Sequence, residues 1–410
     1  MSTRAGAAPA PRDHWLPLDG VRGLAILIVI IHNSAWIAGE SRHILLKLTT
    51  AITATGWIGV SLFFALSGFL ITGILLDTKS RPGFFRSFYL RRTLRIFPLY
   101  YAVIAFTVFV APLIAWSPTW ADSVRANQWP FWLYLTNWIL PFNKMIFGLS
   151  TFWSLAVEEQ FYLFWPLLVW SFTRRRLLTF CLIVMAATPF IRLGLRLSGL
   201  PDNASYFWTI ARWDALVAGA VVAALLRDDT GRLLLARWQG RLAALSAGAL
   251  GALVAWQHGF HSDLMGTQVI GQSLIALLSA CLLAFAVADG AGGPTRLQRW
   301  LSAPGLRTLG KYSYAMYIFH FPIHQLLFPI AEELVRGDDT AWRLARLAVY
   351  ILVVLTLSLL AALGSWRLIE KPFLDLKDRI APRPADRDLT TAGAAVEGEH
   401  QLATRQGGGT

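Results

Sequence analysis

Residues 56–76 read GWIGVSLFFALSGFLITGILL, a stretch of 21 residues without a charged side chain. An α-helix rises 1.5 Å per residue, so about 20 apolar residues cross the hydrocarbon core of a bilayer. The chain of 410 residues contains ten such stretches. They lie at 18–38, 56–76, 97–116, 151–171, 177–198, 210–226, 241–257, 267–287, 311–331 and 343–365. The sequence therefore predicts an all-α, polytopic membrane protein built as a bundle of about ten transmembrane helices.

The composition excludes a soluble enzyme, a disordered chain and a coiled coil. Hydrophobic residues make up 55% and charged residues only 15%, against about 25% charged in soluble domains. The formal net charge of +13 is typical of cytoplasmic loops in a membrane protein, so we expect no nucleic-acid partner. Cys181 and Cys281 lie in apolar runs, which favours neither a disulfide nor a cysteine metal site, and no metal is expected.

The distribution of positive charge predicts the orientation. With the N-terminus inside, the cytoplasmic segments hold 26 Lys and Arg side chains and the outer segments hold 5. This asymmetry predicts that both termini are cytoplasmic. The stretch 129–147 is short and interrupted by Asn137, Pro141 and Asn143, so we interpret it as re-entrant or interfacial.

The ends of the chain differ in composition from the rest. Residues 1–13 and 376–410 are rich in Ala, Pro, Gly and charge, which predicts disordered tails. Residues 14–375 then form the membrane domain. Between its spans, the outer segments 39–55 and 117–150 are expected to form loops and short helices that shape a substrate site.

The first span contains polar residues that are costly in a bilayer. Arg22 lies near its inner end, where it is either a snorkelling interfacial arginine or a functional group. His32 lies roughly 9 Å from the outer end at 1.5 Å per residue. It is either a packed core histidine or a general base, because imidazole titrates near neutral pH.

Two adjacent carboxylates, Glu158 and Glu159, interrupt the span 151–171. Packing alone explains such a pair poorly, and together with the other intramembrane polar groups it predicts a polar internal cavity. Glu158 lies roughly 10 Å below the outer face, the same depth as His32. A carboxylate at that level could orient an imidazole and stabilise its charge.

An arginine cluster precedes the third span. Arg91 and Arg95 share a helical face, with Arg92 beside it. The cluster is either a positively charged anchor at the inner interface or a clamp for the phosphates of an anionic cofactor. Four further polar residues in spans are weaker candidates for lining a substrate cavity, namely Arg212, Asp214, His320 and His324.

Seven motifs in order resemble the signatures of the acyltransferase-3 family of bacterial membrane O-acyltransferases. They are LDGVRGLAILIVIIH (18–32), GVSLFFALSGFLITGILL (59–76), FYLRRTLRIFPLYY (88–101), TFWSLAVEEQFYLFWP (151–166), ARWDALVAGA (211–220), YSYAMYIFHFPI (312–323) and WRLIEKPFL (366–374). The resemblance implies a multi-pass protein of the bacterial cytoplasmic membrane. It also implies transfer of an acyl group, often acetyl, from cytoplasmic acyl-CoA to a hydroxyl of a sugar, glycan or macrolide.

The resemblance also implies roles for particular residues. His32 would be catalytic, Arg22, Arg92 and Arg95 would be needed for activity, and Glu158 or Glu159 would come from the glutamate motif. One departure matters, because nine residues separate Arg22 from His32 where many members have ten. Eleven helical steps return nearly to the same face, whereas ten miss it by about 80°.

Without a gap, Asn33 occupies the usual histidine position, and an amide cannot be a general base. Either the helix is locally irregular or His32 works from a shifted position. We expect Arg91, Arg92 and Arg95 to hold the CoA phosphates while His32 deprotonates the acceptor hydroxyl, with an acyl-histidine as the alternative.

In the expected reaction Glu158 or Glu159 orients the imidazole. Arg22, or Ser67 as a substrate-binding residue, stabilises the oxyanion. The competing interpretation is a transporter, or an acyl-group translocator without acceptor chemistry of its own, since buried polar residues would also line a solute path. Binding of acetyl-CoA distinguishes an acyltransferase from a sugar transporter.

Overall fold

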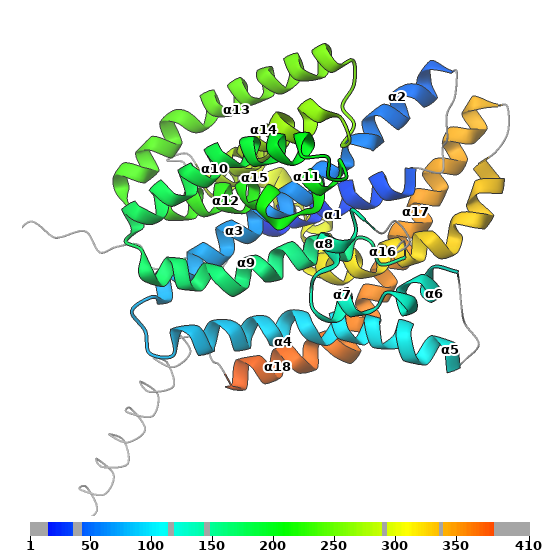
Figure 1. The fold of residues 1–410 in the computed structure, drawn as a ribbon, viewed down its shortest axis with the longest axis horizontal. Coiled ribbons are helices and arrows are strands. Elements are labelled where there is room, and N and C mark those ends of the chain that lie inside the picture. The colour runs from blue at the N-terminus through cyan, green and yellow to red at the C-terminus, as the bar shows by residue number, and fades with distance from the viewer. Residues whose placement is uncertain are drawn as a thin grey trace, which may run out of the picture.

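The computed structural model describes residues 15–35, 43–113, 119–142, 148–288, 293–335 and 339–380. These residues form helices and turns without a strand, as Figure 1 shows. The all-α prediction is confirmed. Each of the ten predicted stretches coincides, over its described residues, with a helix.

The long helices run in a bundle (Figure 1). They are α1 (Leu16–Ala35), α3 (Ile58–Thr78), α4 (Phe84–Ala105), α9 (Phe152–Ser171), α10 (Arg174–Leu197), α12 (Trp213–Leu225), α13 (Asp229–Gln257), α14 (Gln272–Val287), α16 (Pro304–Val335) and α17 (Thr340–Ser365). Shorter helices connect them: α2 (Ile44–Thr53), α5 (Ala111–Leu113), α6 (Thr119–Ala126), α7 (Trp129–Trp132), α8 (Thr136–Ile139), α11 (Ala204–Phe207), α15 (Arg296–Leu301) and α18 (Lys371–Ile380). The remaining pieces are single 3₁₀ or π turns: η2 (Ala54–Trp57), η3 (Phe106–Val110), η4 (Thr209–Ala211), η5 (Thr267–Gly271) and η6 (Trp366–Glu370).

Six helical segments of the described chain are long and apolar enough to cross a membrane. They are Leu16–Ala35, Ile44–Thr78, Phe84–Leu113, Arg174–Leu197, Thr267–Val287 and Thr340–Ile380. The number of about ten spans stays a prediction. The other predicted spans are α12, which is apolar but only 13 residues long, and α9, α13 and α16, which carry charged or imidazole side chains.

The two connections expected to contain short helices do so. Residues 44–57 form α2 and η2, and residues 119–142 contain α6, α7 and α8. In the stretch 129–147, the described part contains two four-residue helices rather than one continuous helix. That this stretch is re-entrant or interfacial stays a prediction.

At the C-terminal side the predicted boundary is corrected. Helix α18 continues to Ile380, so residues 376–380, assigned to the tail, are helical and pack with the rest of α18 against α4. The remaining parts of the predicted tails, 1–13 and 381–410, lie outside the described residues.

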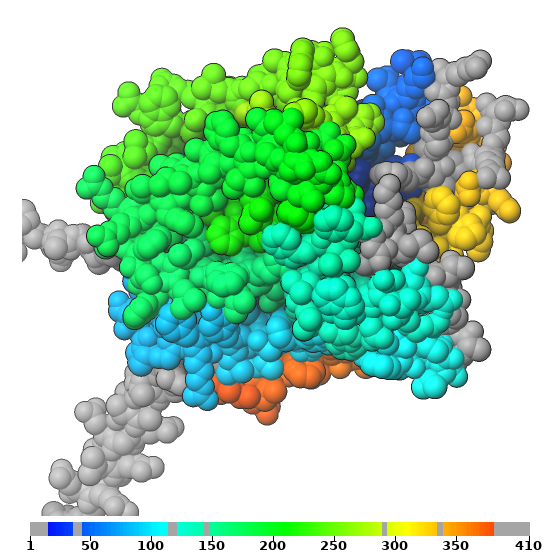
Figure 2. Space-filling view, in the orientation of Figure 1, coloured from blue at the N-terminus to red at the C-terminus, as the bar shows by residue number. Residues whose placement is uncertain are grey.

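In the face of the molecule that Figure 2 shows, α13 and α10 cover the upper side and α4 with α18 the lower side.

The centre of the bundle is built by backbone contacts between helices. Helix α1 packs against α3, α14, α15, α16 and α17. A Cβ at Gly23 would overlap the carbonyl oxygen of Leu306, and one at Gly310 would overlap that of Asp19. Small residues allow this close approach, which is how helices associate in lipid.

Helices α3 and α12 approach each other in the same way. A Cβ at Gly68 would overlap the carbonyl oxygen of Leu216, and a Cβ at Gly219 would overlap that of Ala65. Each helix therefore places a glycine against the other's backbone. The contact leaves no room for a side chain at either position.

We predict that Gly219→Ala destabilises the protein by about 1–3 kcal/mol, because the added methyl forces α3 and α12 apart. The measurement is thermal unfolding of the purified protein in detergent. Gly248→Ala on α13 is the matched control, since a Cβ there meets open space and alanine favours a helix. Equal unfolding temperatures for the two variants would contradict the close contact.

Candidate functional site

At the C-terminal end of α1, two neighbouring side chains contact different parts of the structure. The amide Nδ2 of Asn33 donates to the carbonyl oxygen of Val29 at 3.1 Å and lies 3.2 Å from Nε2 of His320 on α16. His32, one residue earlier, instead has its Nδ1 2.9 Å from the carbonyl oxygen of Thr53. Position 33 thus faces α16, whereas position 32 faces the connection formed by α2 and η2.

Near the N-terminal end of α1, Arg22 contacts Asp19 at 3.2 Å. Arg22 also lies within electrostatic range of Arg92 and Tyr162. These residues come from α1, α4 and α9, so three helices that are distant in sequence meet here. Arg22 belongs to this interior cluster rather than to an isolated interfacial position.

Glu158 lies in the same cluster. The hydroxyl of Tyr162 donates to Oε2 of Glu158 at 3.3 Å and also hydrogen-bonds Ser67 on α3. The guanidinium of Arg92 lies over the Tyr162 ring, 5.2 Å from its centroid. The structure therefore joins Glu158, Ser67, Arg92 and Arg22 around the hydroxyl of Tyr162, a residue that the sequence did not single out.

The predicted contact between a glutamate and His32 is not formed among the described residues. Glu158 bonds within the Tyr162 cluster, and Oε1 of Glu159 is buried with no hydrogen-bond partner in the described chain. Glu159 instead lies within electrostatic range of Tyr100, Tyr101 and other tyrosines. Glu158 lies within electrostatic range of Arg22, which is ten residues or about 15 Å along α1 from His32. The two side chains, Glu158 and His32, therefore do not lie at the same level of the bundle, contrary to the prediction from the sequence.

The three arginines of α4 point to three surroundings. Arg91 pairs with Asp378 of α18 at 3.7 Å, Arg92 lies on Tyr162, and Arg95 lines a cavity. Successive helical residues are rotated by about 100°, which sends Arg92 toward α9 and leaves Arg91 and Arg95 on the side of α18. The single clamp expected from these three residues is thus divided.

The cavity lined by Arg95 has a volume of about 580 Å³. Its walls come from α1, α4, the first turns of α16, and η6 with α18. The charged residues that line it are five cations, Arg22, Arg95, Arg307, Lys311 and Lys377, and two carboxylates, Asp19 and Glu370. Cations outnumber anions, so the cavity is suited to an anion.

One buried atom of the cavity residues lacks a partner. Nε of Arg307 is buried and makes no hydrogen bond within the described chain. Buried donors are normally satisfied, so an unsatisfied one at the wall of a basic cavity is consistent with a missing acceptor. Arg307, Lys311 and Lys377 were not predicted as site residues, because their position in predicted cytoplasmic segments already explained their charge. The spacing of Arg307 and Lys311, which places both on one helical face, was the available signal.

Asp214 is part of a buried ion pair, and its partner, Arg192, was not predicted from the sequence. Its Oδ2 lies 2.5 Å from Arg192 of α10 and accepts from Ser273 at 2.6 Å. Nε of Arg192 donates to the carbonyl oxygen of Ala211 at 2.7 Å. Arg192 is 0% exposed and Asp214 2% exposed, so this pair ties α10, α12 and α14 together.

Arg212 does not share that carboxylate. It hydrogen-bonds Gln272 and Ser61, and its guanidinium lies 5.0 Å from the centroid of the Tyr206 ring. It also lies over the rings of Phe64 and Trp153. The faces of these three rings and the amide of Gln272 stabilise the guanidinium of Arg212, a role that a carboxylate often has in other proteins.

The two histidines of α16 are held by tyrosines. Nδ1 of His320 lies 2.7 Å from the carbonyl oxygen of Tyr317, and Nδ1 of His324 lies 2.7 Å from the hydroxyl of Tyr350. The Tyr317 hydroxyl is 2.6 Å from that of Ser154 on α9. Ser154 lies one turn before Glu158, so polar side chains continue from His320 to the Tyr162 cluster.

The chain belongs to the acyltransferase-3 family. The family model, described as an acyltransferase domain, matches residues 16–366. The prediction of this family is therefore confirmed. The residues named above fall within the matched region, except Glu370, Lys377 and Asp378.

Several bacterial proteins are similar to the chain. A putative peptidoglycan O-acetyltransferase of Bacillus subtilis is 28% identical over 375 residues, which cover 87% of this chain and 54% of that protein. A peptidoglycan O-acetyltransferase of Listeria monocytogenes is 27% identical over 390 residues, covering 88% of this chain and 56% of that protein. The chain thus spans little more than half the length of these relatives. No solved structure matches it.

We predict that Asp214→Asn destabilises the protein by about 3–5 kcal/mol, because it leaves Arg192 charged and buried without a counterion. The unfolding midpoint in detergent measures the loss. Asp229→Asn is the control, because Asp229 pairs with Arg232 at the surface, where ion pairs contribute about 0–1 kcal/mol. Similar midpoints for the two variants would show that the buried pair is not required.

Proposed function

We propose that the protein is a membrane O-acetyltransferase that moves an acetyl group from acetyl-CoA to a hydroxyl of a cell-surface glycan such as peptidoglycan. Family membership supports acyl transfer, and the printed names of the relatives support O-acetylation of peptidoglycan. The same function with an acyl-CoA other than acetyl-CoA as donor, or with a macrolide as acceptor, is an alternative form of this proposal. The basic cavity is the observation that supports acyl-CoA as the donor of the acyl group.

The cavity suits the nucleotide end of an acyl-CoA. That end carries several phosphate groups, and Arg and Lys bind phosphate through charge-assisted hydrogen bonds. Five cations from four separate parts of the chain line the cavity, and the buried Nε of Arg307 lacks an acceptor within the described residues. Of the predicted clamp only Arg95 lines the cavity, where it is joined by Arg22, Arg307, Lys311 and Lys377.

The acyl end would then reach the Tyr162 cluster. Arg22 lines the cavity and also lies within electrostatic range of Arg92 and Tyr162. The flexible arm of CoA would pass Arg22 and bring the thioester carbonyl to Ser67, Tyr162 and Arg92. These side chains are donors that can stabilise the oxyanion, and Glu158 can hold their orientation.

The reaction then proceeds by direct transfer. A histidine near the outer end of α1 accepts the proton of the acceptor hydroxyl, while the hydroxyl oxygen attacks the carbonyl carbon of the thioester. The carbon–sulfur bond breaks, and the CoA thiolate takes up the proton from the imidazolium. His32 and His320 both lie at this end of α1.

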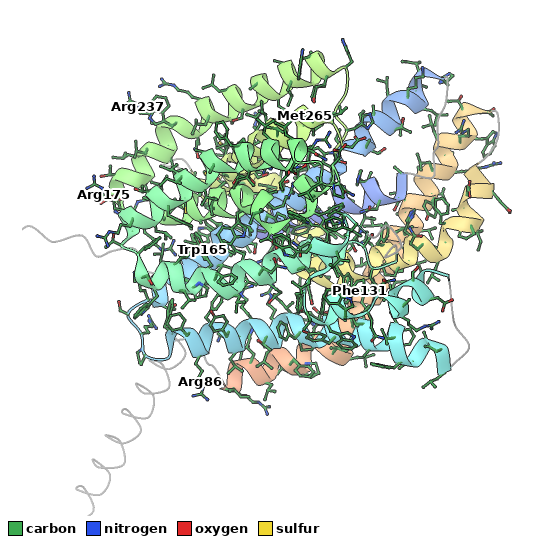
Figure 3. All side chains as sticks on the ribbon, in the orientation of Figure 1. Arg86, Phe131, Trp165, Arg175, Arg237 and Met265 are labelled. Atoms are coloured by element: carbon green, nitrogen blue, oxygen red, sulfur yellow. The ribbon has the colours of Figure 1, made fainter. Side chains whose placement is uncertain are left out.

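The orientation fits a cytoplasmic donor. Figure 3 shows Arg86, Arg175 and Arg237, from three segments with predicted cytoplasmic location, at one end of the bundle. We propose that this end faces the cytoplasm of a bacterial cell. Arg212 and the histidines of α16 would then lie toward the acceptor side.

We predict that Arg95→Ala and Lys311→Ala each raise the KM for acetyl-CoA about tenfold or more, since each removes a charged partner of phosphate worth roughly 1.5–3 kcal/mol. The measurement is CoA release from acetyl-CoA by the protein in nanodiscs. Arg86→Ala is the control, because Arg86 lies on the same helix, is exposed and is outside this cavity. Its KM should equal that of the wild type.

Two results would overturn the proposal. If Arg95→Ala and Lys311→Ala behave like Arg86→Ala, acyl-CoA does not occupy the cavity. If the wild type neither binds acetyl-CoA nor releases CoA, the acyltransferase function fails and the transporter becomes the better account. CoA binding and release without transfer to peptidoglycan fragments would favour an acyl translocator.

A further inference from the structure

We propose that His320, rather than His32, is the catalytic base that takes the proton from the acceptor hydroxyl. The proposal rests on the proposed O-acetyltransferase function and assigns a residue within it. The observation behind it is the contact between Nδ2 of Asn33 and Nε2 of His320, 3.2 Å apart. This contact places a histidine of α16 against the α1 position that lies above Arg22.

The direction of the α1 side chains favours His320. Eleven helical steps separate Arg22 from Asn33 and bring the two residues within about 20° of one face. Arg22 takes part in the interior cluster, so position 33 faces the interior as well. The ring of His32 is rotated toward Thr53, and its Cβ lies against Gly56. An acceptor that reaches the face of α1 above Arg22 therefore meets Asn33 and His320.

The hydrogen bonds of His320 fix its tautomer. A carbonyl oxygen only accepts, so Nδ1 of His320 carries the hydrogen donated to Tyr317 at 2.7 Å. Nε2 is then the ring atom with the lone pair, and it is the atom that Asn33 contacts. Neutral imidazole with one nitrogen oriented by a carbonyl is the state required of a general base.

Asn33 has the chemistry to place the hydroxyl. One hydrogen of its Nδ2 goes to Val29 and the other points to Nε2 of His320. A hydroxyl that replaces the second contact would donate its proton to Nε2 and remain beside the amide. The amide itself cannot take up a proton, so Asn33 is a positioning residue and His320 the base.

The surroundings of His320 connect it to the acyl end of the donor. His320 is fully buried, and Tyr317, one turn before it, bonds to Ser154 at 2.6 Å. Ser154 lies on α9 with Glu158 one turn further on. The base is thus linked to the helix that carries Glu158 and Tyr162, along the direction in which the acyl arm of the donor would extend from the cavity.

The test compares His320→Gln and His32→Gln in nanodiscs, with acetyl-CoA and purified peptidoglycan fragments as substrates. We expect His320→Gln to lower kcat by about 10²–10⁴-fold, as loss of a general base does, with an unchanged KM for acetyl-CoA. We expect His32→Gln to lower kcat far less than His320→Gln, because the His32 ring contacts the backbone carbonyl of Thr53 and such a hydrogen bond contributes about 1 kcal/mol. The reverse pattern would overturn the proposal and assign the base to His32.

A rescue experiment separates catalysis from packing. In the double variant Asn33→His with His320→Gln, a new imidazole stands at the position that contacts residue 320. We expect at least a tenfold gain of kcat over His320→Gln alone, whereas a purely structural role for His320 predicts no gain. If His320→Gln does not fold, the turnover of His32→Gln tests the proposal. Loss of turnover in this variant overturns the proposal, and turnover close to that of the wild type supports it. A wild type that releases no CoA refutes the proposed function itself, and this inference with it.

Discussion

The backbone contact between α1 and α16 is the interaction on which the rest of the structure depends. Glycines at positions 23 and 310 let the two helices approach until a Cβ would overlap a carbonyl of the partner. This pairing places Arg22 near Arg307 and Lys311 at one end, and Asn33 against His320 at the other. Eleven residues along α1 span about 16 Å, so one helix pair sets the distance between the donor cavity and the proposed base.

Lipid provides no water for buried polar groups, so each of them needs a partner inside the bundle. Two solutions occur here. Arg192 and Asp214 form a closed ion pair with Ser273, which leaves no capacity for a substrate. The basic cavity is not balanced in this way, because cations exceed carboxylates around it and the buried Nε of Arg307 has no partner in the described chain. We interpret the first as structural and the second as functional.

Much of the fold was predictable from hydrophobic runs, because helix length in a bilayer is fixed by membrane thickness. All ten stretches lie on helices. The site was only partly predictable. Arg22, Ser67, Arg92 and Glu158 were selected as costly charges or motif residues, and the structure brings them together. Arg307, Lys311 and Lys377 were not selected, since a positive charge near the inner interface needs no functional explanation.

The rotation of side chains about helices accounts for the remaining differences. The sequence placed Arg91, Arg92 and Arg95 in one clamp, but their neighbours are Asp378, Tyr162 and the cavity, respectively. Which helix lies on each side of α4 cannot be derived from a single sequence. The same limit applied to α1, where the spacing anomaly was visible but the partner of Asn33 was not.

The central claim is that one interior path joins a basic donor cavity to the cluster around Tyr162. A cryo-EM map of the protein in nanodiscs with bound CoA tests this claim most directly. The account predicts phosphate density between Arg22, Arg95 and Lys311, with the arm of CoA directed toward Ser67 and Tyr162. Density for CoA at another surface, with this cavity empty, would contradict it.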